Sequence, residues 1–422
     1  MPVPSAAPGI LPAVSVVHVP FRRPFAPRDP HEAHRAATPL ELLFDLVFVV
    51  AIASNAAQLH HGISAGHLNI ILGYTFGWFA IWWAWMGYTW YASAYDNDDV
   101  IFRLLSFVIM SGSLALAAAI PDLVADGQSA LGVAGYAIMR LGLVALWLRA
   151  AAHDPARRAT ALTYAAGITV VQLLWIARLW VPESWTLPTF FIGVALELSV
   201  PWIAERRRGA TPYHPHHIAE RYGLLTIIVL GEVILSTVVA IQGAMSATTS
   251  ESSGGHTAPY TSAAGSGVGL NMLPLVIGGL LIVFSLWWLY FKRDHVDLVE
   301  DDSTVFFFGY AHLPVFASIA AVGGILAASV DVVQHASESS DRTIGLLLGA
   351  CVSVFVLTLA GIHSLRAPSP ARVMLEALLV AVVLLALPFI GLSANWGVLA
   401  VGLVLSMTVA QHVWVSSRTL RD

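Results

Sequence analysis

Twelve long apolar segments run through this chain, and they constrain its fold more than any other feature of the sequence. Each is long enough to cross the roughly 30 Å hydrocarbon layer of a bilayer as a helix of about 20 residues. Only 11% of the 422 residues are charged, against about 25% in a typical soluble domain. Most of the surface must therefore face lipid, and we predict an all-α bundle of transmembrane helices. The predicted spans are residues 40–60, 69–92, 101–120, 130–150, 159–181, 187–204, 218–242, 272–291, 304–329, 343–363, 372–390 and 395–414.

The basic residues predict how these spans are oriented. With the N-terminus in the cytoplasm, seventeen of the 21 Lys and Arg residues fall on the cytoplasmic side, and Arg342 falls in an outward loop. The remaining three, Arg140, Arg178 and Arg221, fall within spans. Cytoplasmic loops of membrane proteins carry an excess of Lys and Arg. We therefore predict a multi-pass protein of the bacterial cytoplasmic (inner) membrane, with both termini inside.

The chain divides into two halves of six predicted spans, residues 38–208 and 209–422. The segment FAIWWAW at 79–85 matches FSLWWLY at 284–290. Six spans in each half predict a parallel repeat, related by an axis along the membrane normal. Further landmarks occur in the same order in both halves: Glu41 and Asp98-Asp99 in the first, Glu220 and Asp301-Asp302 in the second.

Two segments have the composition of flexible chain. Residues 1–37 are rich in proline, and we predict that they form a disordered cytosolic tail. Residues 246–269 are rich in Ser and Gly, and we predict a flexible outer loop that acts as a spacer.

The first span contains two carboxylates within a run of apolar residues. On a helix with 100° per residue, Asp45 lies 40° to one side of Glu41, and Asn55 lies 40° to the other. Exposing this polar stripe to lipid would be costly, so it should face the interior of the bundle. Asp45 is a candidate cation or proton site, or else it pairs with a buried arginine. Glu41 is a supporting group, or a charge that stabilises the helix start after Pro39.

Three further charges fall near the middle of their spans. An unpaired ion at this depth costs a few kcal/mol, so Arg140 should pair with Glu197 or Glu232. The other glutamate would then be spare and could carry a proton; alternatively, the three charges form a static network. Glu220 and Arg221 at the start of one span, and His312 within another, are supporting candidates.

The acidic segment YDNDD at 95–99, followed by Arg103, is the most enzyme-like feature of the sequence. Clustered carboxylates such as Asp96, Asp98 and Asp99 can hold Mg²⁺. The alternative is a set of helix caps and ion pairs at a cytosolic helix start. The sequence contains no Gly-rich phosphate loop, nucleophile elbow or HExxH motif, and no cofactor is predicted. It also lacks the basic and aromatic pattern of nucleic-acid binding.

Four segments together resemble the bacterial low-temperature-requirement A (LtrA) family. The likeness extends from residue 38 to about residue 415. It implies a polytopic membrane protein, and the family name refers to growth in the cold. The segments that carry the resemblance are TPLELLFDLVFVVAIA (38–53), YDNDDVIFRLL (95–105), HIAERYGLLTIIVLGEVIL (217–235) and YAHLPVF (310–316).

From the buried charges we predict that the protein moves an ion or small solute through a polar interface between its halves. Asp45 and Glu232 would bind a cation or proton, and Arg140 with Glu197 would form a neutralising bridge. Two alternatives remain at this point. One is a membrane enzyme acting on a lipid headgroup with Mg²⁺ at Asp96, Asp98 and Asp99. The other is a sensor or scaffold whose buried charges only fix helix packing.

Overall fold

The computed structural model describes residues 20–23, 25–32, 35–127, 129–251, 270–301 and 303–419, and in these ranges it contains thirteen α-helices and no β-strand. The all-α prediction is therefore confirmed. The helices are α1 (Pro39–Ser64), α2 (Ile70–Tyr95), α3 (Val100–Asp126), α4 (Ala130–His153), α5 (Arg158–Ala177), α6 (Thr186–Arg208), α7 (Pro215–Glu251), α8 (Leu273–Phe291), α9 (Val296–Glu300), α10 (Val305–Val333), α11 (Asp341–Ser364), α12 (Pro370–Ala386) and α13 (Ala394–Thr419).

Among the described residues, twelve of these helices are long and apolar enough to span a membrane. They coincide with the twelve predicted spans, and the extra helix, α9, has only five residues. The outer loop predicted at 246–269 begins too early, because α7 continues through Glu251. No Gly or Pro interrupts residues 244–251, so nothing in the local sequence ends the helix there. The rest of that loop lies outside the described residues.

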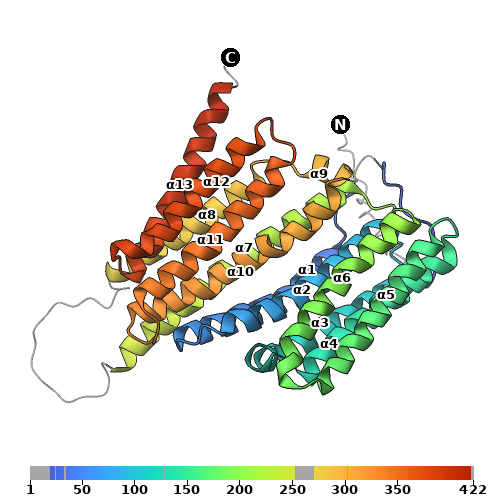
Figure 1. Ribbon diagram of the computed structural model, residues 1–422, viewed down its shortest axis with the longest axis horizontal. Coiled ribbons are helices and arrows are strands. Elements are labelled where there is room, and N and C mark those ends of the chain that lie inside the picture. The colour runs from blue at the N-terminus through green and yellow to red at the C-terminus, as the bar shows by residue number, and fades with distance from the viewer. Residues whose placement is uncertain are drawn as a thin grey trace, which may run out of the picture.

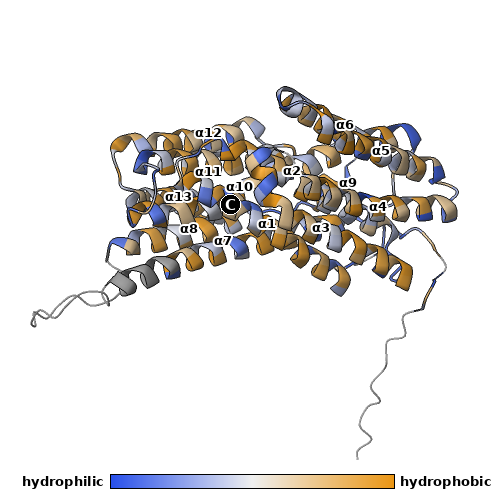
Figure 2. Ribbon diagram, turned by 90° about the horizontal axis from the view of Figure 1, so that it is seen from below, coloured by the Kyte–Doolittle hydropathy of each residue, from blue (hydrophilic) through white to orange (hydrophobic). Residues whose placement is uncertain are grey.

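The helices form two groups with α1 and α2 between them (Figures 1 and 2). Helices α3, α4, α5 and α6 make up one group, and α7, α8, α10, α11, α12 and α13 make up the other. Helix α1 packs against α2 and α3 on one side and against α7 and α10 on the other. The interface between the predicted halves therefore runs along α1, α2, α7 and α10.

The last helix of each predicted half is placed differently. Helix α13 packs closely along α8, where a Cβ atom on Gly402 would lie 2.7 Å from the carbonyl oxygen of Gly278. Helix α6, in contrast, packs mainly against α5 and stands away from α2 (Figure 2). The group that contains α6 therefore has room for an internal cavity.

Part of the predicted disordered tail is ordered. Phe25 stacks on Tyr95 with 5.7 Å between ring centroids, and Arg28 N donates a hydrogen bond to Ala94 O at 2.9 Å. Arg35 is buried against the end of α2. For residues 20–23, 25–32 and 35–37 the prediction of disorder is therefore wrong, because these side chains bind polar and aromatic groups at the helix ends. Residues 1–19, 24, 33 and 34 lie outside the described residues.

Candidate functional site

The inward face of α1 carries the carboxylates of the first span. Glu41, Asp45 and Asn55 are all fully buried, as their shared helical face predicts. Thr38 begins the helix with a capping box: Thr38 Oγ1 accepts a hydrogen bond from Glu41 N, and Glu41 Oε2 accepts one from Thr38 N at 2.8 Å. One oxygen of Glu41 is thus used by its own helix. The other, Oε1, faces side chains from elsewhere.

Arg221 of α7 binds both carboxylates of α1. Its Nη2 donates to Asp45 Oδ1 at 2.6 Å and its Nε to Asp45 Oδ2 at 3.2 Å, which is a bidentate pairing. Arg221 Nη1 and His217 Nε2 lie 3.2 and 3.1 Å from Glu41 Oε1. Trp85 Nε1 also donates to Asp45, at 2.7 Å. We define the seam cluster as Arg35, Glu41, Asp45, His217 and Arg221, because it joins α1 to α7.

Arg35 and Asp96 form the edge of the seam cluster. Arg35 Nη2 lies 3.7 Å from Glu41 Oε1 and 4.0 Å from Asp96 Oδ2. Asp96 lies between the ends of α2 and α3, where burial raises its pKa to about 6; the nearby charge of Glu41 adds to the rise and Arg35 opposes it. The two arginines of the cluster thus compensate Glu41 and Asp45, so Asp45 has the buried arginine partner that was one of its two predicted alternatives.

The acidic residues at 95–99 point to three different arginines. Asp98 makes a bidentate ion pair with Arg103 at 2.8 and 3.0 Å. Asp99 accepts from Arg149 Nη1 at 3.0 Å and caps α3 through Phe102 N, while Asp96 faces Arg35. In the part of the chain that the structure describes, no three His, Cys, Asp or Glu side chains are grouped to hold a metal ion. The arrangement that the magnesium-enzyme alternative requires is therefore not formed, because each carboxylate is drawn to its own arginine.

A second buried ion pair joins α4 to α6. Arg140 Nη2 lies 3.1 Å from Glu197 Oε2, which is the pairing expected for Arg140. Three neutral donors complete the environment of Glu197: Trp83 Nε1 at 2.8 Å, Tyr136 OH at 2.8 Å and Trp175 Nε1 at 3.1 Å. Arg140 also donates to Tyr136 OH, and the Nε of Arg140 is buried without a hydrogen-bond partner among the described residues.

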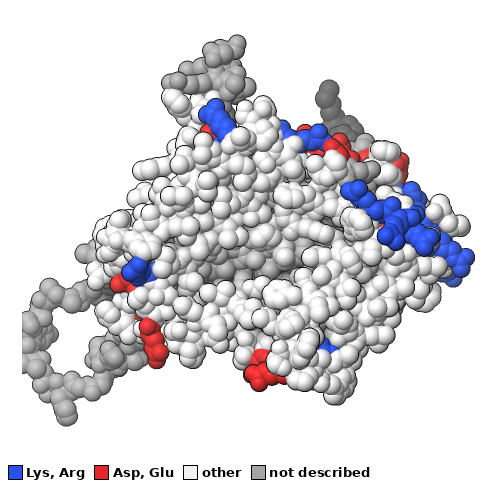
Figure 3. All heavy atoms as spheres, in the orientation of Figure 1, with Lys and Arg blue, Asp and Glu red and all other residues white. Residues whose placement is uncertain are grey.

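This ion pair forms the inner end of a cavity of about 500 Å³. Side chains from α2, α4, α5, α6 and α10 line it, together with the segment between α6 and α7. Arg140 is thirteen residues from the end of α4 at His153, or about 20 Å along the helix, so the cavity reaches the middle of the bundle. Its other end lies beside Arg206 at the end of α6. Figure 3 shows the surface hollowed between the two helix groups and basic residues gathered where α5 begins and α6 ends.

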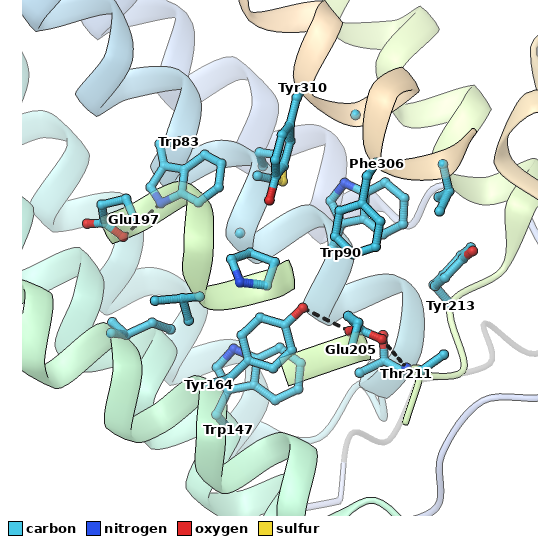
Figure 4. Close-up of a pocket in the computed structure, with 18 of the residues that line it drawn as sticks. Trp83, Trp90, Trp147, Tyr164, Glu197, Glu205, Thr211, Tyr213, Phe306 and Tyr310 are labelled. Atoms are coloured by element: carbon cyan, nitrogen blue, oxygen red, sulfur yellow. Dashed lines mark hydrogen bonds between the residues drawn. The ribbon is translucent and has the colours of Figure 1, made fainter. Parts of the chain in front are cut away.

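Seven aromatic side chains contribute to the cavity wall (Figure 4). The rings of Trp147 and Tyr164 stack in parallel at 4.1 Å. Glu205 lies beside them and accepts hydrogen bonds from Tyr164 OH at 2.8 Å and from Thr211 N at 2.7 Å. The remaining aromatic residues of the wall are Trp83, Trp90, Tyr213, Phe306 and Tyr310. Such a cavity suits a small organic molecule, since binding sites combine apolar and aromatic walls with a few fixed polar groups.

Comparison with known proteins identifies the family of the chain. The model of one protein family, described as bacterial low temperature requirement A protein (LtrA), matches residues 36–410. The chain belongs to the LtrA family. It is also 28% identical over 310 residues to uncharacterized protein RA0937 of Rhizobium meliloti (strain 1021), covering 69% of this chain and 67% of that protein. No solved structure matches the chain.

Three predicted site residues of this LtrA protein lie away from the cavity. Glu232 of α7 is partly buried and accepts a hydrogen bond from Ser236 Oγ at 2.8 Å, so it does not reach Arg140. Glu220 Oε2 accepts from Ala37 N at 3.2 Å, outside the seam cluster. His312 is buried in α10, where Nδ1 donates to Phe308 O and Nε2 lies 3.0 Å from Tyr290 OH.

The aromatic wall was not among the residues singled out from the LtrA sequence. Trp83 belongs to the segment that matches between the two halves, and Glu205 precedes Arg206, Arg207 and Arg208, a context typical of the charged end of a helix. The available signal was the density of Trp and Tyr near one end of several spans. That density alone also fits the aromatic belt at a membrane interface, so only the fold distinguishes the two.

Proposed function

We propose that this LtrA protein moves a small organic solute across the membrane and binds it in the aromatic cavity. The observation that carries the proposal is the cavity itself, which extends from one end of the bundle to the Arg140–Glu197 pair at its middle. A binding site at the bilayer midplane is typical of transporters. At the inner end of the cavity, Arg140 and Glu197 can exchange their mutual ion pair for ion pairs with a charged solute.

The described conformation fits the inward-facing state of such a transporter. With Arg206, Arg207 and Arg208 in the cytoplasm, the cavity opens toward the cytoplasmic side. Beyond Arg140 and Glu197, aromatic rings close the path to the other side. Phe76 and Phe190 stack at 3.9 Å, and Trp175 lies 5.7 Å from Phe190. Opening this aromatic plug while closing the cavity would give alternating access.

Helix α6 is the element suited to this movement. Pro201 lies inside α6, and because proline has no N–H it leaves the carbonyl of Glu197 without its helical donor. Beyond its packing on α5, α6 is held by the donors to Glu197, by the stacking of Phe190 on Phe76, and by Tyr310 OH, which donates to Leu198 O at 2.9 Å. Breaking a few polar contacts next to Pro201 would therefore free α6 to rock against α2 and α10.

The geometry favours an organic solute over passage of an inorganic ion through Asp45. Both oxygens of Asp45 are bound by Arg221, and the site is fully buried. Glu232 has no ion pair among the described residues and lies away from the cavity. A cation entering the seam cluster would have to displace Arg221 from two carboxylates, whereas a solute can enter the cavity without displacing an ion pair.

Thiol accessibility in membrane vesicles tests the proposal. In a Cys351→Ala background, Gly87→Cys places a thiol deep in the cavity, Ala210→Cys places one near its mouth, and Ala118→Cys on the outer face of α3 is the control. A membrane-impermeant maleimide should label Ala210→Cys from the cytoplasmic side only. Gly87→Cys should react from both sides, because alternating access exposes it to each in turn. Reaction of Gly87→Cys from one side only would reduce the cavity to a binding pocket and overturn the proposed transport.

The link to growth in the cold is part of the same proposal. If transport through the cavity is what the family's low-temperature requirement reflects, a strain lacking the protein should regain growth at low temperature with the wild-type chain. Complementation with Arg140→Gln should fail, although the variant is present in the membrane at the wild-type level. Full complementation by Arg140→Gln would separate the cold requirement from the cavity.

A further inference from the structure

A second hollow lies between α5 and α6, on the outer surface of the bundle. It is a groove of about 620 Å³, and its lining includes Ala159, Ala166 and Val171 on α5 and Leu196 and Ile203 on α6. Ala159, Ala166 and Ile203 are exposed, so the groove is open to the surrounding membrane. Helices α5 and α6 lie side by side at the edge of the molecule in Figures 1 and 2.

Apart from Arg208 at one end, the groove is lined by apolar side chains and two hydroxyl groups, and it is closed at its floor. The two hydroxyl groups in its wall are satisfied locally, since Thr163 donates to Ala159 O and Ser199 to Leu196 O. At the floor a Cβ atom on Gly167 would lie 2.8 Å from a methyl group of Val200, so the two helices touch there. Away from Arg208, the lining therefore offers an occupant mainly hydrocarbon contacts.

The length of the groove matches one leaflet of a bilayer. Its lining extends over twelve residue-to-residue steps along each helix, from Ala159 to Val171 on α5 and from Leu196 to Arg208 on α6. Twelve residues of α-helix are about 18 Å long, and one leaflet contributes about half of a 30 Å hydrocarbon layer. A groove of this length can hold one acyl chain along its full depth.

Basic side chains surround one end of the groove. Arg208 is itself part of the lining, and Arg158 and Arg207 are exposed beside it at the same ends of α5 and α6. Within the described ranges, no carboxylate lies in salt-bridge distance of these three residues. Figure 3 shows the basic residues of this end as a continuous patch. The patch lies at headgroup depth, where an anionic lipid carries its phosphate.

We propose that the α5–α6 groove binds one anionic phospholipid, with an acyl chain between the helices and the phosphate at Arg208 and Arg158. Charge complementarity selects the headgroup, and the apolar groove selects a molecule with a long hydrocarbon chain. This site lies on the outside of the α5–α6 pair and is separate from the aromatic cavity. It therefore does not depend on whether that cavity transports a solute.

The test measures lipid binding to the purified full chain in detergent by native mass spectrometry. Phosphatidylglycerol and phosphatidylcholine with the same acyl chains are titrated against the wild type. Arg208→Gln removes the charge and Ala166→Leu fills the groove; both residues are exposed, so folding is retained. Arg372→Gln and Ala118→Leu are matched changes at exposed positions elsewhere.

The wild type should bind phosphatidylglycerol at least tenfold more tightly than phosphatidylcholine. Arg208→Gln should weaken this binding about fivefold, which is the contribution of one basic residue near an anionic membrane surface, and Arg208→Lys should restore most of it. Ala166→Leu should weaken binding of both lipids, while the two matched controls match the wild type. Equal binding of the two lipids, or unchanged binding in both Arg208→Gln and Ala166→Leu, would overturn the proposal. Displacement of phosphatidylglycerol by an equal concentration of glycerol phosphate would also overturn it, since it would reveal a site for a soluble anion.

Discussion

The seam cluster and the Arg140–Glu197 pair are both buried ion clusters inside a membrane protein, yet their surroundings differ. In the seam cluster, Glu41, Asp45, His217 and Arg221 are fully buried and lie between tightly packed helices. Arg140 and Glu197 are almost as buried, but they form the end wall of a 500 Å³ cavity. The first cluster is enclosed by protein, and the second directly borders the cavity.

This difference indicates two uses of the same chemistry. Charges enclosed by protein can only be compensated by each other, so the seam cluster fixes how α1 meets α7. Charges beside a cavity can exchange partners with a solute or with water, at a lower cost in free energy. The position of a buried ion pair relative to a cavity therefore separates a packing role from a binding role better than its burial does.

Removing Arg221 should have the largest effect on stability, because it leaves Glu41 and Asp45 together without their main counter-charge. We expect Arg221→Gln to lower the free energy of unfolding by about 3–5 kcal/mol, the range for breaking a buried ion pair. Denaturant titration in detergent micelles measures the change. Arg342→Gln, at an exposed arginine stacked on Phe389, should stay within about 0.5 kcal/mol of the wild type. A loss at Arg221 no larger than at Arg342 would contradict the packing role.

Asp96 at the edge of the seam cluster should give a pH dependence. Its pKa is raised from 3.8 to about 6, mainly by burial. The folded state therefore favours the protonated form, and stability is full below about pH 4 and is lost as the pH rises through 6. Since one pKa unit corresponds to about 1.4 kcal/mol, the loss should be roughly 2–3 kcal/mol.

Comparison of the wild type with Asp96→Asn isolates this contribution, because asparagine cannot ionise. Between pH 4 and pH 7 the wild type should lose stability relative to Asp96→Asn by that amount, as measured by denaturant titration at both pH values. A difference between the two proteins that is the same at pH 4 and pH 7 would show that the carboxyl group titrates normally.

The Arg140–Glu197 pair should cost less to break. In Arg140→Gln, Glu197 keeps three hydrogen-bond donors from Trp83, Tyr136 and Trp175, and the adjacent cavity can admit water. We expect a loss of about 2 kcal/mol, typical for one hydrogen bond to a charged group. The same variant should abolish labelling of Gly87→Cys from the outer side, because the proposed transport cycle depends on this pair. A stability loss as large as that of Arg221→Gln would remove the distinction between the two clusters.

The sequence predicted the inner face of α1 and the pairing of Arg140 for simple physical reasons. Helical periodicity places Glu41, Asp45 and Asn55 on one face, and lipid excludes that face. A lone charge in a span needs a partner of opposite charge, and the candidates at a similar depth for Arg140 were Glu197 and Glu232. The choice between Glu197 and Glu232 depended on how α4, α6 and α7 pack, which no local pattern encodes.

The cavity and the ordered part of the tail depend on contacts between distant segments. Arg35 reaches the seam cluster only because residues 35–37 lie across the helix ends, and its sequence context is that of a flexible tail. The cavity exists because α6 stands away from α2 while α13 packs on α8. The segments that match between the two predicted halves give no sign of this difference. The packing of α6 and α13 therefore depends on contacts between helices, which the local sequence does not encode.

The smallest effect is expected at an exposed ion pair of the second half. Asp301, before α10, binds Arg366 at the end of α11, and both side chains are partly exposed. Asp99, before α3, binds Arg149 at the end of α4 in the same way, but its side chain is fully buried. Exposed ion pairs contribute about 0–1 kcal/mol, whereas Asp99 also caps its helix. Asp301→Asn should therefore leave the free energy of unfolding close to that of the wild type, whereas Asp99→Asn should lower it by about 2 kcal/mol. Equal losses at the two sites would show that burial does not decide the strength of these pairs.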